Sequence, residues 1–222
     1  QNSGANSKIR IKYFDNKIIA LKKIKLDQRL TPRKQLQIFL REVIGQVIAE
    51  FPCVLPICGF NIFHYSNYFN KFVFKPSLST LFCEGGNLGA SLKSMRRNEL
   101  LTQKQIQTQQ FIYAYGIARG MEKLHSLNIL HRDLKDANIF VRVPSWNSHT
   151  VPDELIPLFE NQSYFIPLIA DLGLSKITQD SQQSQQCGTF YYCAPEVLSS
   201  TKYSFPADIY SYAVILSNIF LL

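Results

Sequence analysis

The hydrophobic pattern of this sequence changes its period near the Glu-Gly-Gly-Asn run at residues 84–87. Before this run, segments such as Ile9 to Tyr13 alternate apolar and polar residues, which is typical of half-buried strands. After it, apolar residues recur every three or four positions, which is typical of amphipathic helices. With 222 residues, 46% of them hydrophobic, the chain can bury a sizeable core. The pattern therefore predicts an α+β fold with a small strand-rich part and a larger helical part.

The beginning of the strand-rich part predicts a hairpin followed by a helix. Asp15-Asn16 interrupts the alternation from Lys8 to Leu26, which predicts a strand, a turn and a second strand. Thr31-Pro32 supplies a cap and a first helical residue, so a helix is expected from there to Phe51-Pro52. The apolar stripe of this helix is expected to comprise Leu36, Phe39, Leu40, Val43, Val47 and Ile48.

Further elements follow from the same patterns. The aromatic-rich residues 62–74 are strand-like, with interruptions at Asn67 and Asn70, and a short apolar strand is expected to end near Phe82. A long amphipathic helix is expected around residues 111–124. Residues 207–222 are apolar nearly all round, which predicts a helix buried in the core.

Two segments have neither period. Residues 144–163 contain three prolines and are expected to form an inserted loop. Residues 179–186 are rich in Gln and Ser and are expected to be a mobile stretch.

The charge of the chain is uneven. Residues 1–111 contain 17 Lys and Arg against 6 Asp and Glu, whereas residues 112–222 contain 7 against 10. A basic half can contact an anionic partner, or it can simply be a solvated surface. Aromatic residues do not alternate with the basic ones from Lys8 to Arg41, so a stacking platform for single strands is not visible and no nucleic acid is expected as a partner.

The cysteines and the ends of the chain indicate in which cellular compartment the protein is expected. The five cysteines form no Cys-x-x-Cys pair and no zinc spacing with the four histidines, so reduced, buried thiols are expected. No apolar run reaches about 18 residues, so no membrane segment is expected. In the absence of targeting features the default localisation is cytoplasmic. The first residue is not Met and the last apolar helix has no cap, so the chain is expected to be a fragment truncated at both ends.

The octapeptide HRDLKDAN at residues 131–138 carries the clearest chemistry. It combines a carboxylate, an ammonium group and a carboxamide at spacings of two and five, which suits a loop whose side chains converge on one polar centre. Asp133 can accept a proton or orient a hydroxyl, Lys135 can neutralise a phosphate, and Asn138 can offer an oxygen to a hard cation. Each residue alone would be an ordinary loop residue.

Six of these eight residues match the catalytic loop of eukaryotic protein kinases, and the chain resembles that family over nearly its whole length. The segment IALK at 19–22 resembles the strand whose lysine holds the α- and β-phosphates, which nominates Lys22. Glu42 on the following helix resembles the ion-pair partner of that lysine. Asp171, in Asp-Leu-Gly, resembles the aspartate that binds magnesium. The resemblance thus implies that Asn138 and Asp171 are the metal ligands.

The resemblance also assigns an activation segment and a supporting group. The stretch from Gly188 to Glu196 resembles the end of the activation segment, including Thr189, and Ser181 or Ser184 is a candidate phosphorylated switch that Arg132 would read. A linker that needs no phosphate is the alternative. His131, Arg132 and Asp208 are expected to support the catalytic loop, with Asp208 at the start of the buried helix.

The same resemblance implies an adenine pocket. Ile9 and Ala20 would lie above the ring and Phe140 below it, Thr80 is expected as the gatekeeper, and residues 81–83 are expected as the hinge. The full set of residues expected at ATP is Gly4, Ile9, Ala20, Lys22, Glu42, Thr80, Leu81, Cys83 and Phe140.

Two departures from the family pattern leave the activity open. Of the three glycines of the phosphate-covering loop only Gly4 remains, because Asn2 and Ser7 occupy the other two positions. Gln46 stands where the family has an apolar residue that links the helix to the activation segment, and a polar residue there could loosen the active arrangement. Glu84 and Asp136 could favour basic substrate side chains, or could be solvated loop charges.

The resemblance implies a two-lobed kinase fold: an N-lobe and hinge over residues 1–83 and a partial C-lobe over 84–222, with an insertion at about 144–163. It implies transfer of the γ-phosphoryl group of ATP to Ser or Thr hydroxyls of protein substrates, with Mg²⁺ or Mn²⁺, and a possible upstream kinase. Lys135 and Thr189 favour Ser/Thr over Tyr specificity. The alternative is a pseudokinase or scaffold that binds nucleotide weakly.

Overall fold

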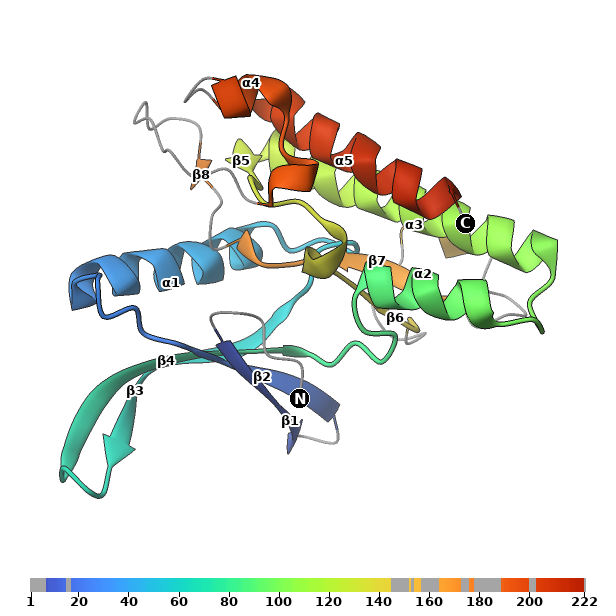
Figure 1. The fold of residues 1–222 in the computed structure, drawn as a ribbon. Helices are drawn as coiled ribbons and strands as arrows, with labels where there is room; N and C mark the ends of the chain where they lie inside the picture. Colours follow the sequence, from blue (N-terminus) through green and yellow to red (C-terminus); the bar gives the residue numbers. More distant parts are fainter. Residues whose placement is uncertain are drawn as a thin grey trace.

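The structure, a computed structural model, describes residues 7–14, 17–144, 152, 154–156, 164–172, 176–177, 189–199 and 203–221. It consists of a strand-rich N-terminal part and a mainly helical C-terminal part (Figure 1). The N-terminal part contains β1 (Ser7–Phe14), β2 (Lys17–Ile24), α1 (Pro32–Ile48), β3 (Ile57–Ser66) and β4 (Lys71–Leu81). This arrangement confirms the predicted α+β fold with two lobes.

The C-terminal part contains the helices and several short strands. Its helices are α2 (Leu88–Arg97), α3 (Gln103–Ser126), α4 (Pro195–Ser199) and α5 (Phe205–Phe220), with 3₁₀ turns η1 (Asp136–Asn138) and η4 (Phe190–Tyr192). Its strands are β5 (Ile129–Leu130), β6 (Ile139–Arg142), β7 (Ile166–Ile169) and β8 (Lys176–Ile177). They pair as two antiparallel ribbons, β5 with β8 and β6 with β7.

The N-terminal sheet is antiparallel, with strand order β1-β2-β4-β3, and α1 lies against one of its faces (Figure 1). The helix begins as expected, because the Thr31 side chain accepts a hydrogen bond from the Lys34 N–H and Pro32 takes the first position. Phe39 and Val43 pack on Leu78 of β4. This small core holds the helix on the sheet.

The last turn of α1 departs from the predicted stripe. Val47 and Ile48 are exposed, whereas Glu42 and Gln46 are buried beside Phe39 and Val43. The buried row of α1 therefore includes two polar residues, and both have partners across the interface, as described below.

Strands β3 and β4 form a long hairpin. The turn falls at the predicted interruption, with Asn70 in the left-handed region at φ 48°. The first strand starts at Ile57, five residues earlier than predicted. Its register shifts between Ile57 and Gly59 and again between Asn61 and Phe63, so simple alternation is lost there.

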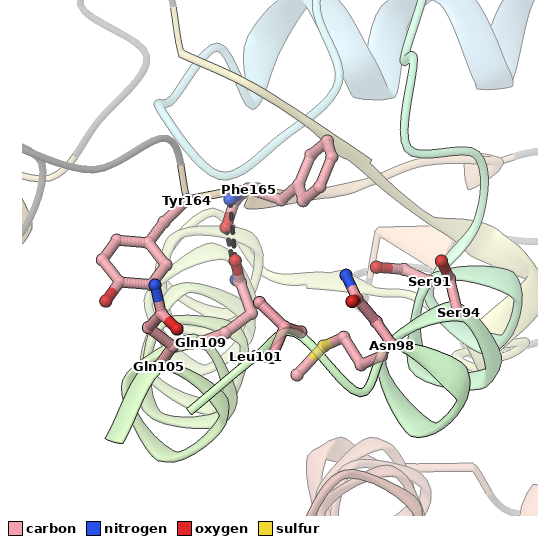
Figure 2. Close-up of a pocket in the computed structure, with 9 residues that line it drawn as sticks. Ser91, Ser94, Asn98, Leu101, Gln105, Gln109, Tyr164 and Phe165 are labelled. Carbon is pink, nitrogen blue, oxygen red and sulfur yellow. Dashed lines mark hydrogen bonds between the residues drawn. The ribbon is translucent and has the colours of Figure 1, made fainter. Parts of the chain in front are cut away.

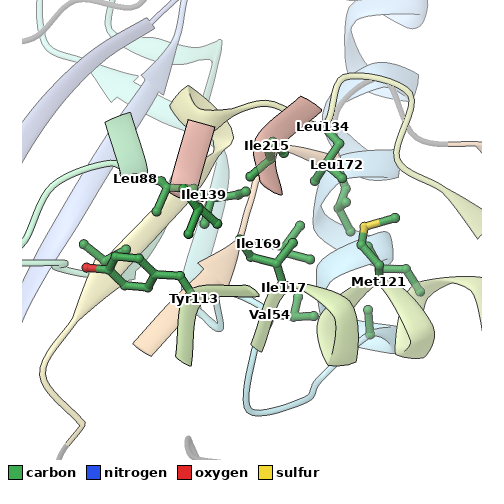
Figure 3. Packing of buried hydrophobic residues seen from close by; sticks show 14 of the residues in the cluster. Val54, Leu88, Tyr113, Ile117, Met121, Leu134, Ile139, Ile169, Leu172 and Ile215 are labelled. Atoms are coloured by element: carbon green, nitrogen blue, oxygen red, sulfur yellow. The ribbon is translucent and has the colours of Figure 1, made fainter. Parts of the chain in front are cut away.

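The main core lies between α3, α5, β6 and β7 (Figure 3). Two glycines of α3 allow close contact with neighbouring segments, at the Pro167 ring and at the Cys53 backbone. A Cβ atom at Gly116 would lie 2.6 Å from Pro167 Cγ, and one at Gly120 would lie 2.9 Å from the Cys53 carbonyl oxygen. The core is completed by Tyr113, Ile117, Leu134, Ile139, Ile169, Leu172 and Ile215.

The segment between the two parts is bound to β6. The Gly85 N–H donates to the Val141 carbonyl over 3.1 Å, and the Val141 N–H donates to Gly86 over 2.9 Å. The Glu84 carboxylate accepts a hydrogen bond from the Val143 N–H over 2.7 Å. A Cβ atom at Gly85 would lie 2.6 Å from a Val141 methyl carbon, so the close approach requires glycine.

Two further expectations need correction. The described residues of α5 bury one side, including Ala207, Ser211 and Ile215, while Ile209 and Tyr210 are exposed, so the helix is not buried all round. Cys53, Cys58 and Cys83 are free thiols, but Cys193 is disulfide-bonded, so the expectation of thiols throughout is wrong at that residue. No described helix is long and apolar enough to cross a membrane.

Candidate active site

The loop from β5 to β6 gathers several groups around Asp133. Lys135 Nζ donates to Asp133 Oδ2 over 2.6 Å, and Asn138 Nδ2 donates to the same oxygen over 3.1 Å and to the Asp133 carbonyl over 2.8 Å. The Thr189 N–H donates to Asp133 Oδ1 over 3.0 Å, and Lys135 Nζ also reaches Thr189 Oγ1 over 2.8 Å. The octapeptide therefore converges on one carboxylate, as its spacing predicts.

A second cluster joins the two parts of the molecule. Lys22 Nζ on β2 lies 2.8 Å from Glu42 Oε1 on α1 and 3.3 Å from Asp171 Oδ1, which follows β7. Lys22 and Asp171 are 149 residues apart in the sequence. The structure thus brings together the three charged residues that the resemblance nominated.

Burial and charge act on this cluster in opposite directions. Burial would lower the pKa of Lys22, but Glu42 and Asp171 outweigh it and the pKa is raised. Burial raises the pKa of Glu42, and Lys22 offsets only part of that increase. Lys22 is therefore a firmly charged cation, whereas the charge of Glu42 depends on its partner.

Asp171 and Asn138 have the chemistry of a hard-cation site. Asp171 follows the last buried residues of β7 and adopts φ 65°, a left-handed conformation that is uncommon outside glycine. The Ala170 N–H donates to the Asn138 carbonyl over 2.9 Å, which holds the two segments together. A carboxylate and a carboxamide oxygen suit Mg²⁺, which completes its shell with substrate phosphates and water. The described residues contain no cluster of three or more His, Cys, Asp or Glu that could hold a metal alone.

Asp208 holds the backbone of the catalytic loop from the start of α5. It is fully buried at the start of α5 and accepts hydrogen bonds from the backbone N–H groups of His131, over 2.8 Å, and Arg132, over 3.0 Å. His125 Nε2 lies 3.0 Å from Asp208, and the Tyr203 hydroxyl donates to it over 2.8 Å. Burial would raise the pKa of Asp208, but these hydrogen bonds and the nearby His131 outweigh it and the pKa is lowered.

The loop held by Asp208 has further constraints. Arg132 adopts φ 71°, and its guanidinium lies 5.3 Å from the centre of the Tyr203 ring. The His131 ring lies 3.1 Å from the Ala170 carbonyl, next to Asp171. The sequence reasoning missed His125 and Tyr203, because nothing local to either residue marks it as a partner of Asp208.

The expected adenine-site residues lie along the sheet and the segment that leaves it. Ala20 pairs with Thr80 across β2 and β4, and Ile9 pairs with Lys22 across β1 and β2. The Cys83 thiol is buried, and burial raises its pKa to about 12. Leu81, Cys83 and Phe140 belong to one apolar cluster that includes β7 residues.

Part of the predicted site falls outside the described residues: Gly4, Ser181 and Ser184. Thr189 contacts Asp133 as given above, and Glu196 is the second residue of α4. The roles of Ser181 and Ser184 as a phosphorylated switch, and of Gly4 in the phosphate-covering loop, therefore stay predictions.

Gln46 is buried in the α1 interface, and its effect on the active arrangement stays a prediction. Its Nε2 donates to the Leu55 carbonyl over 3.2 Å, which links α1 to the segment before β3. Its Oε1 is buried without a hydrogen-bond partner in the described structure. The amide nitrogen of Gln46 is therefore hydrogen-bonded, whereas its amide oxygen is not.

A contact that the sequence did not predict links three segments near the catalytic loop. Asn218 Nδ2 on α5 donates to Asp136 Oδ2 over 3.0 Å and to the Tyr192 hydroxyl over 3.4 Å. Burial raises the pKa of Asp136. Asp136 is therefore not simply a solvated loop charge.

A separate cavity of about 290 Å³ lies away from this site, between α2, α3 and the residues that lead into β7 (Figure 2). Gln109 donates to the Phe165 carbonyl over 2.7 Å and accepts from the Phe165 N–H over 2.8 Å, which ties that segment to α3. None of the described residues that line the cavity is charged. It has none of the features of a phosphoryl-transfer centre.

The fold and the site together define a protein kinase domain. A strand lysine paired with a helix glutamate, a catalytic-loop aspartate and a separate aspartate at the end of β7 meet at one place. The family model described as protein kinase domain matches residues 3–221. The chain belongs to the protein kinase family.

Its relatives include serine/threonine-protein kinases of very different organisms. A probable serine/threonine-protein kinase of Dictyostelium discoideum is 28% identical over 214 residues, covering 96% of this chain and 14% of the relative. Serine/threonine-protein kinase TNNI3K of Mus musculus is 29% identical over 220 residues, covering 96% and 22%. The RGS domain-containing serine/threonine-protein kinase A of Dictyostelium discoideum is 33% identical over 141 residues, covering 64% and 10%. The chain thus spans less than a quarter of the length of these relatives.

Proposed function

We propose that the chain is the catalytic domain of an ATP- and Mg²⁺-dependent protein kinase that phosphorylates Ser and Thr hydroxyls of proteins. The observation that carries this proposal is the position of Lys22, which contacts Glu42 of α1 and Asp171 of the C-terminal part at once. A scaffold has no need to keep these three charges together. The names of the relatives support the choice of Ser and Thr.

The roles of the residues follow from the chemistry of phosphoryl transfer. The transition state spreads negative charge over the transferred oxygens, so positioning and positive charge do most of the catalysis. Lys22 holds the α- and β-phosphates, and Glu42 fixes the Lys22 ammonium. Mg²⁺ held by Asp171 and Asn138 would neutralise charge on the phosphates.

Asp133 orients the acceptor hydroxyl, and Lys135 faces the γ-phosphate. Both carboxylate oxygens of Asp133 already accept hydrogen bonds, Oδ1 from Thr189 and Oδ2 from Lys135 and Asn138, so a substrate hydroxyl replaces one of these donors. The Thr189 N–H on Oδ1 is the partner to be displaced, since Lys135 and Asn138 both bind Oδ2. Thr189 thereby couples the activation segment to substrate entry.

The test is transfer of radiolabel from ATP to a generic protein substrate, followed by identification of the phosphorylated amino acid. Asp133→Asn is expected to lose at least about 100-fold in kcat, because it removes the group that aligns the hydroxyl. Asp27→Asn, at an exposed carboxylate paired with Arg29, is the matched control and is expected to retain activity. Equal labelling by the wild type and Asp133→Asn would contradict the proposal.

The pseudokinase is the competing function, and metal dependence separates it. A kinase loses all transfer in EDTA and regains it with Mg²⁺ or Mn²⁺. A protein that binds ATP but transfers no label under either condition would be a pseudokinase. Label found on tyrosine would contradict the Ser/Thr assignment alone.

Phosphorylation of Ser181 or Ser184 by an upstream kinase is proposed as the activating switch, with Arg132 as the residue that reads the phosphate. The test compares kinase activity before and after phosphatase treatment, beside Ser181→Ala and Ser184→Ala. If all of these leave the activity unchanged, the switch is not in these residues.

A further inference from the structure

The N-terminal sheet has an unusual charge composition. Strands β1 to β4 contain eight Lys and Arg residues, three in β1, three in β2 and two in β4, and not one Asp or Glu. Of these cations, Lys22 pairs with carboxylates in the active site. The others have no such role in catalysis.

The strand register places four of these cations on one face, and a fifth, Lys75, lies close enough for its charge to act on Lys23. Lys22 and Leu78 are paired on neighbouring strands and face α1. Side chains alternate along a strand, so Lys23 next to Lys22 points to the opposite face. The basic sheet face, as we call it, comprises Arg10, Lys12, Lys17, Lys23 and Lys75.

The pairing explains why these residues belong together. Arg10 lies opposite Leu21, and Lys12 lies opposite Ile19, both an even number of positions from Lys23 on β2. Lys17 is on the same side of β2 by the same count. On β4, Ser77 pairs with Lys23, but the register shifts between Ser77 and Phe74, so alternation does not place Lys75. Lys75 is included because its charge acts on Lys23.

The charges of the basic sheet face are not neutralised by the described chain. Among the residues that the structure describes, none of the five cations forms an ion pair. Partial burial and the cations of Arg10, Lys75 and Lys12 lower the pKa of Lys23. These like charges repel one another, and an anionic partner would relieve the repulsion.

The face is also uncovered. Figure 1 shows α1 on one side of the sheet and no described helix on the other. The turn of the β3–β4 hairpin projects away from the helices, and it carries exposed aromatic residues. Tyr68, Phe69 and Phe72, which we call the aromatic tip, are 90%, 60% and 70% exposed.

The aromatic tip continues the basic sheet face along β4. Lys71 and Lys75 lie four residues apart on β4, and Lys71 is the first residue of the strand after the turn. Lys71 Nζ lies 5.9 Å from the centre of the Phe69 ring. Cations thus extend from the middle of the sheet to the tip.

We propose that the basic sheet face and the aromatic tip dock this chain on a membrane surface that contains anionic phospholipids. The cations attract the negative headgroups, and exposed Phe and Tyr rings partition into the interfacial layer. The docked face is opposite to the one that carries Lys22, so the active site stays open to substrate. The proposal does not depend on the proposed kinase activity.

A nucleic acid fits this surface less well. Recognition of single strands uses aromatic rings interleaved with cations, so that bases can stack. On the basic sheet face, Phe14 lies at the β1–β2 turn, and the pairing of β3 with β4 places Phe63 and Phe72 on the half of the face near the β3–β4 turn. The exposed rings therefore gather mainly on β3 and β4, and the cations mainly on β1 and β2. The separation of rings and cations favours an interface between water and lipid.

The first test measures co-sedimentation of the purified protein with vesicles of phosphatidylcholine alone or with roughly 30% phosphatidylserine. We expect binding to the anionic vesicles only, and weaker binding as salt rises from about 0.1 to 0.5 M. Equal binding to both vesicle types, or to neither, would overturn the proposal. Far-UV circular dichroism of each variant checks that it is folded.

Charge variants locate the contact. Arg10→Gln, Lys12→Gln and Lys75→Gln are each expected to weaken binding to anionic vesicles about fivefold, and about 100-fold when combined. The matched control removes three exposed lysines from helices, Lys34→Gln, Lys93→Gln and Lys104→Gln, and is expected to change binding less than about threefold. Equal losses in the two triple variants would show that net charge, not this face, drives binding. The single replacements keep the test decisive if the triple variant does not fold.

The aromatic tip distinguishes lipid from nucleic acid. Tyr68→Ser with Phe69→Ser is expected to lower vesicle binding about tenfold or more, because both rings leave the interface. Leu100→Ser, at a side chain that is 91% exposed elsewhere, is the control and is expected to have no effect. A labelled single-stranded or duplex oligonucleotide that binds more tightly than the anionic vesicles, with no loss in the tip variant, would reject the membrane and identify a nucleic acid site.

Discussion

Two buried carboxylates in this molecule have opposite electrostatic surroundings. Asp208 accepts two backbone N–H groups, a tyrosine hydroxyl and a contact from His125, and its pKa is lowered. Glu42 has Lys22 as its charged partner, and burial raises its pKa. Both residues are at most 5% exposed. Burial alone therefore does not decide the direction of the pKa shift of a carboxylate: hydrogen bonds and His131 lower that of Asp208, whereas burial and the neighbouring Asp171 raise that of Glu42.

The difference matches the two tasks. Asp208 fixes the backbone at His131 and Arg132, which must stay in one conformation for Asp133 to point correctly. Glu42 holds the ammonium of Lys22, which contacts Asp171 as well and, in the proposed function, has to accommodate a nucleotide. Asp208 has four hydrogen-bonding partners that hold it in place, whereas Lys22 can keep its ion pair with Asp171 when its pair with Glu42 is broken. The catalytic loop is thus the rigid half of the site and the Lys22 pair the adjustable half.

Removing the anchor gives the largest expected effect on stability. Asp208→Ala leaves two buried N–H groups and the Tyr203 hydroxyl without their acceptor, and is expected to cost about 3–5 kcal/mol of unfolding free energy. Urea denaturation measures it. Asp27→Ala, at an exposed carboxylate, is the control and is expected to change stability little. Similar losses of unfolding free energy in both variants would mean that the buried hydrogen bonds of Asp208 do not stabilise the fold more than an exposed carboxylate does.

Breaking the adjustable pair separates activity from stability. Glu42→Gln is expected to reduce kcat/KM about 10- to 100-fold, because Lys22 loses its orientation. Its unfolding free energy is expected to stay the same or rise, since burial disfavours the ionised carboxylate that is removed. Glu50→Gln, at an exposed carboxylate just after α1, is the matched control for both measurements. A large loss of unfolding free energy in Glu42→Gln would contradict the view that Glu42 serves activity whereas Asp208 stabilises the fold.

The opposite pKa shifts define a pH window. Glu42 has its pKa raised above the ordinary 4.5, so acid protonates it early and breaks its pair with Lys22 without unfolding the chain, because the folded state binds this proton more tightly than the unfolded state. Asp208 has its pKa lowered below 3.8, so the stability that it contributes is present above that pH and is lost only as pH falls through its folded pKa. Activity is therefore expected to disappear at a higher pH than the fold.

The measurement is kcat/KM beside far-UV circular dichroism over the same acid series. In Glu42→Gln the acid limb due to Glu42 is expected to be absent. Activity and structure that disappear together at one pH, in the wild type, would contradict the expected order.

The smallest effect tests one partner of the anchor. Tyr203→Phe removes the hydroxyl that donates to Asp208 but keeps the ring beside Arg132, and is expected to cost about 1 kcal/mol. Thermal denaturation measures it. A loss of unfolding free energy as large as that of Asp208→Ala would mean that the Tyr203 hydrogen bond alone accounts for the stabilisation by Asp208.

The sequence predicts the parts of this molecule that depend on local signals. The start of α1 is predicted because Thr31 and Pro32 act on residues of their own turn, and the catalytic loop is predicted because its residues are contiguous. The pair of Lys22 and Glu42 and the role of Asp171 came from family resemblance, since nothing local connects them. The beginning of β3 was missed because its irregular register at Gly59 hides the alternation.

Tertiary contacts account for the rest. Hydrophobicity alone places Val47 and Ile48 inside, yet Glu42 and Gln46 are buried instead, because they meet Lys22 and the Leu55 carbonyl across the interface. Helix α2 was not predicted, although Asn87 caps it with a hydrogen bond from the Ala90 N–H. The contact between Asp136 and Asn218 joins residues 82 positions apart, and no pattern in the sequence reports it.

The segment that connects the two parts has a mechanical consequence. Glu84, Gly85 and Gly86 are all bound to β6, through the side chain of Glu84 and through reciprocal backbone hydrogen bonds with Val141. These residues therefore move with the C-terminal part as one rigid body. The connection after α1 is also bound to the C-terminal part, because Leu55 and Cys53 form backbone hydrogen bonds with Ile169 of β7. Rotation of the sheet and α1 against the helices would therefore turn about this connection and about residues 81–83, which the family resemblance assigns to the hinge. A ligand that stiffens residues 81–83 would slow opening and closing without touching the reacting atoms.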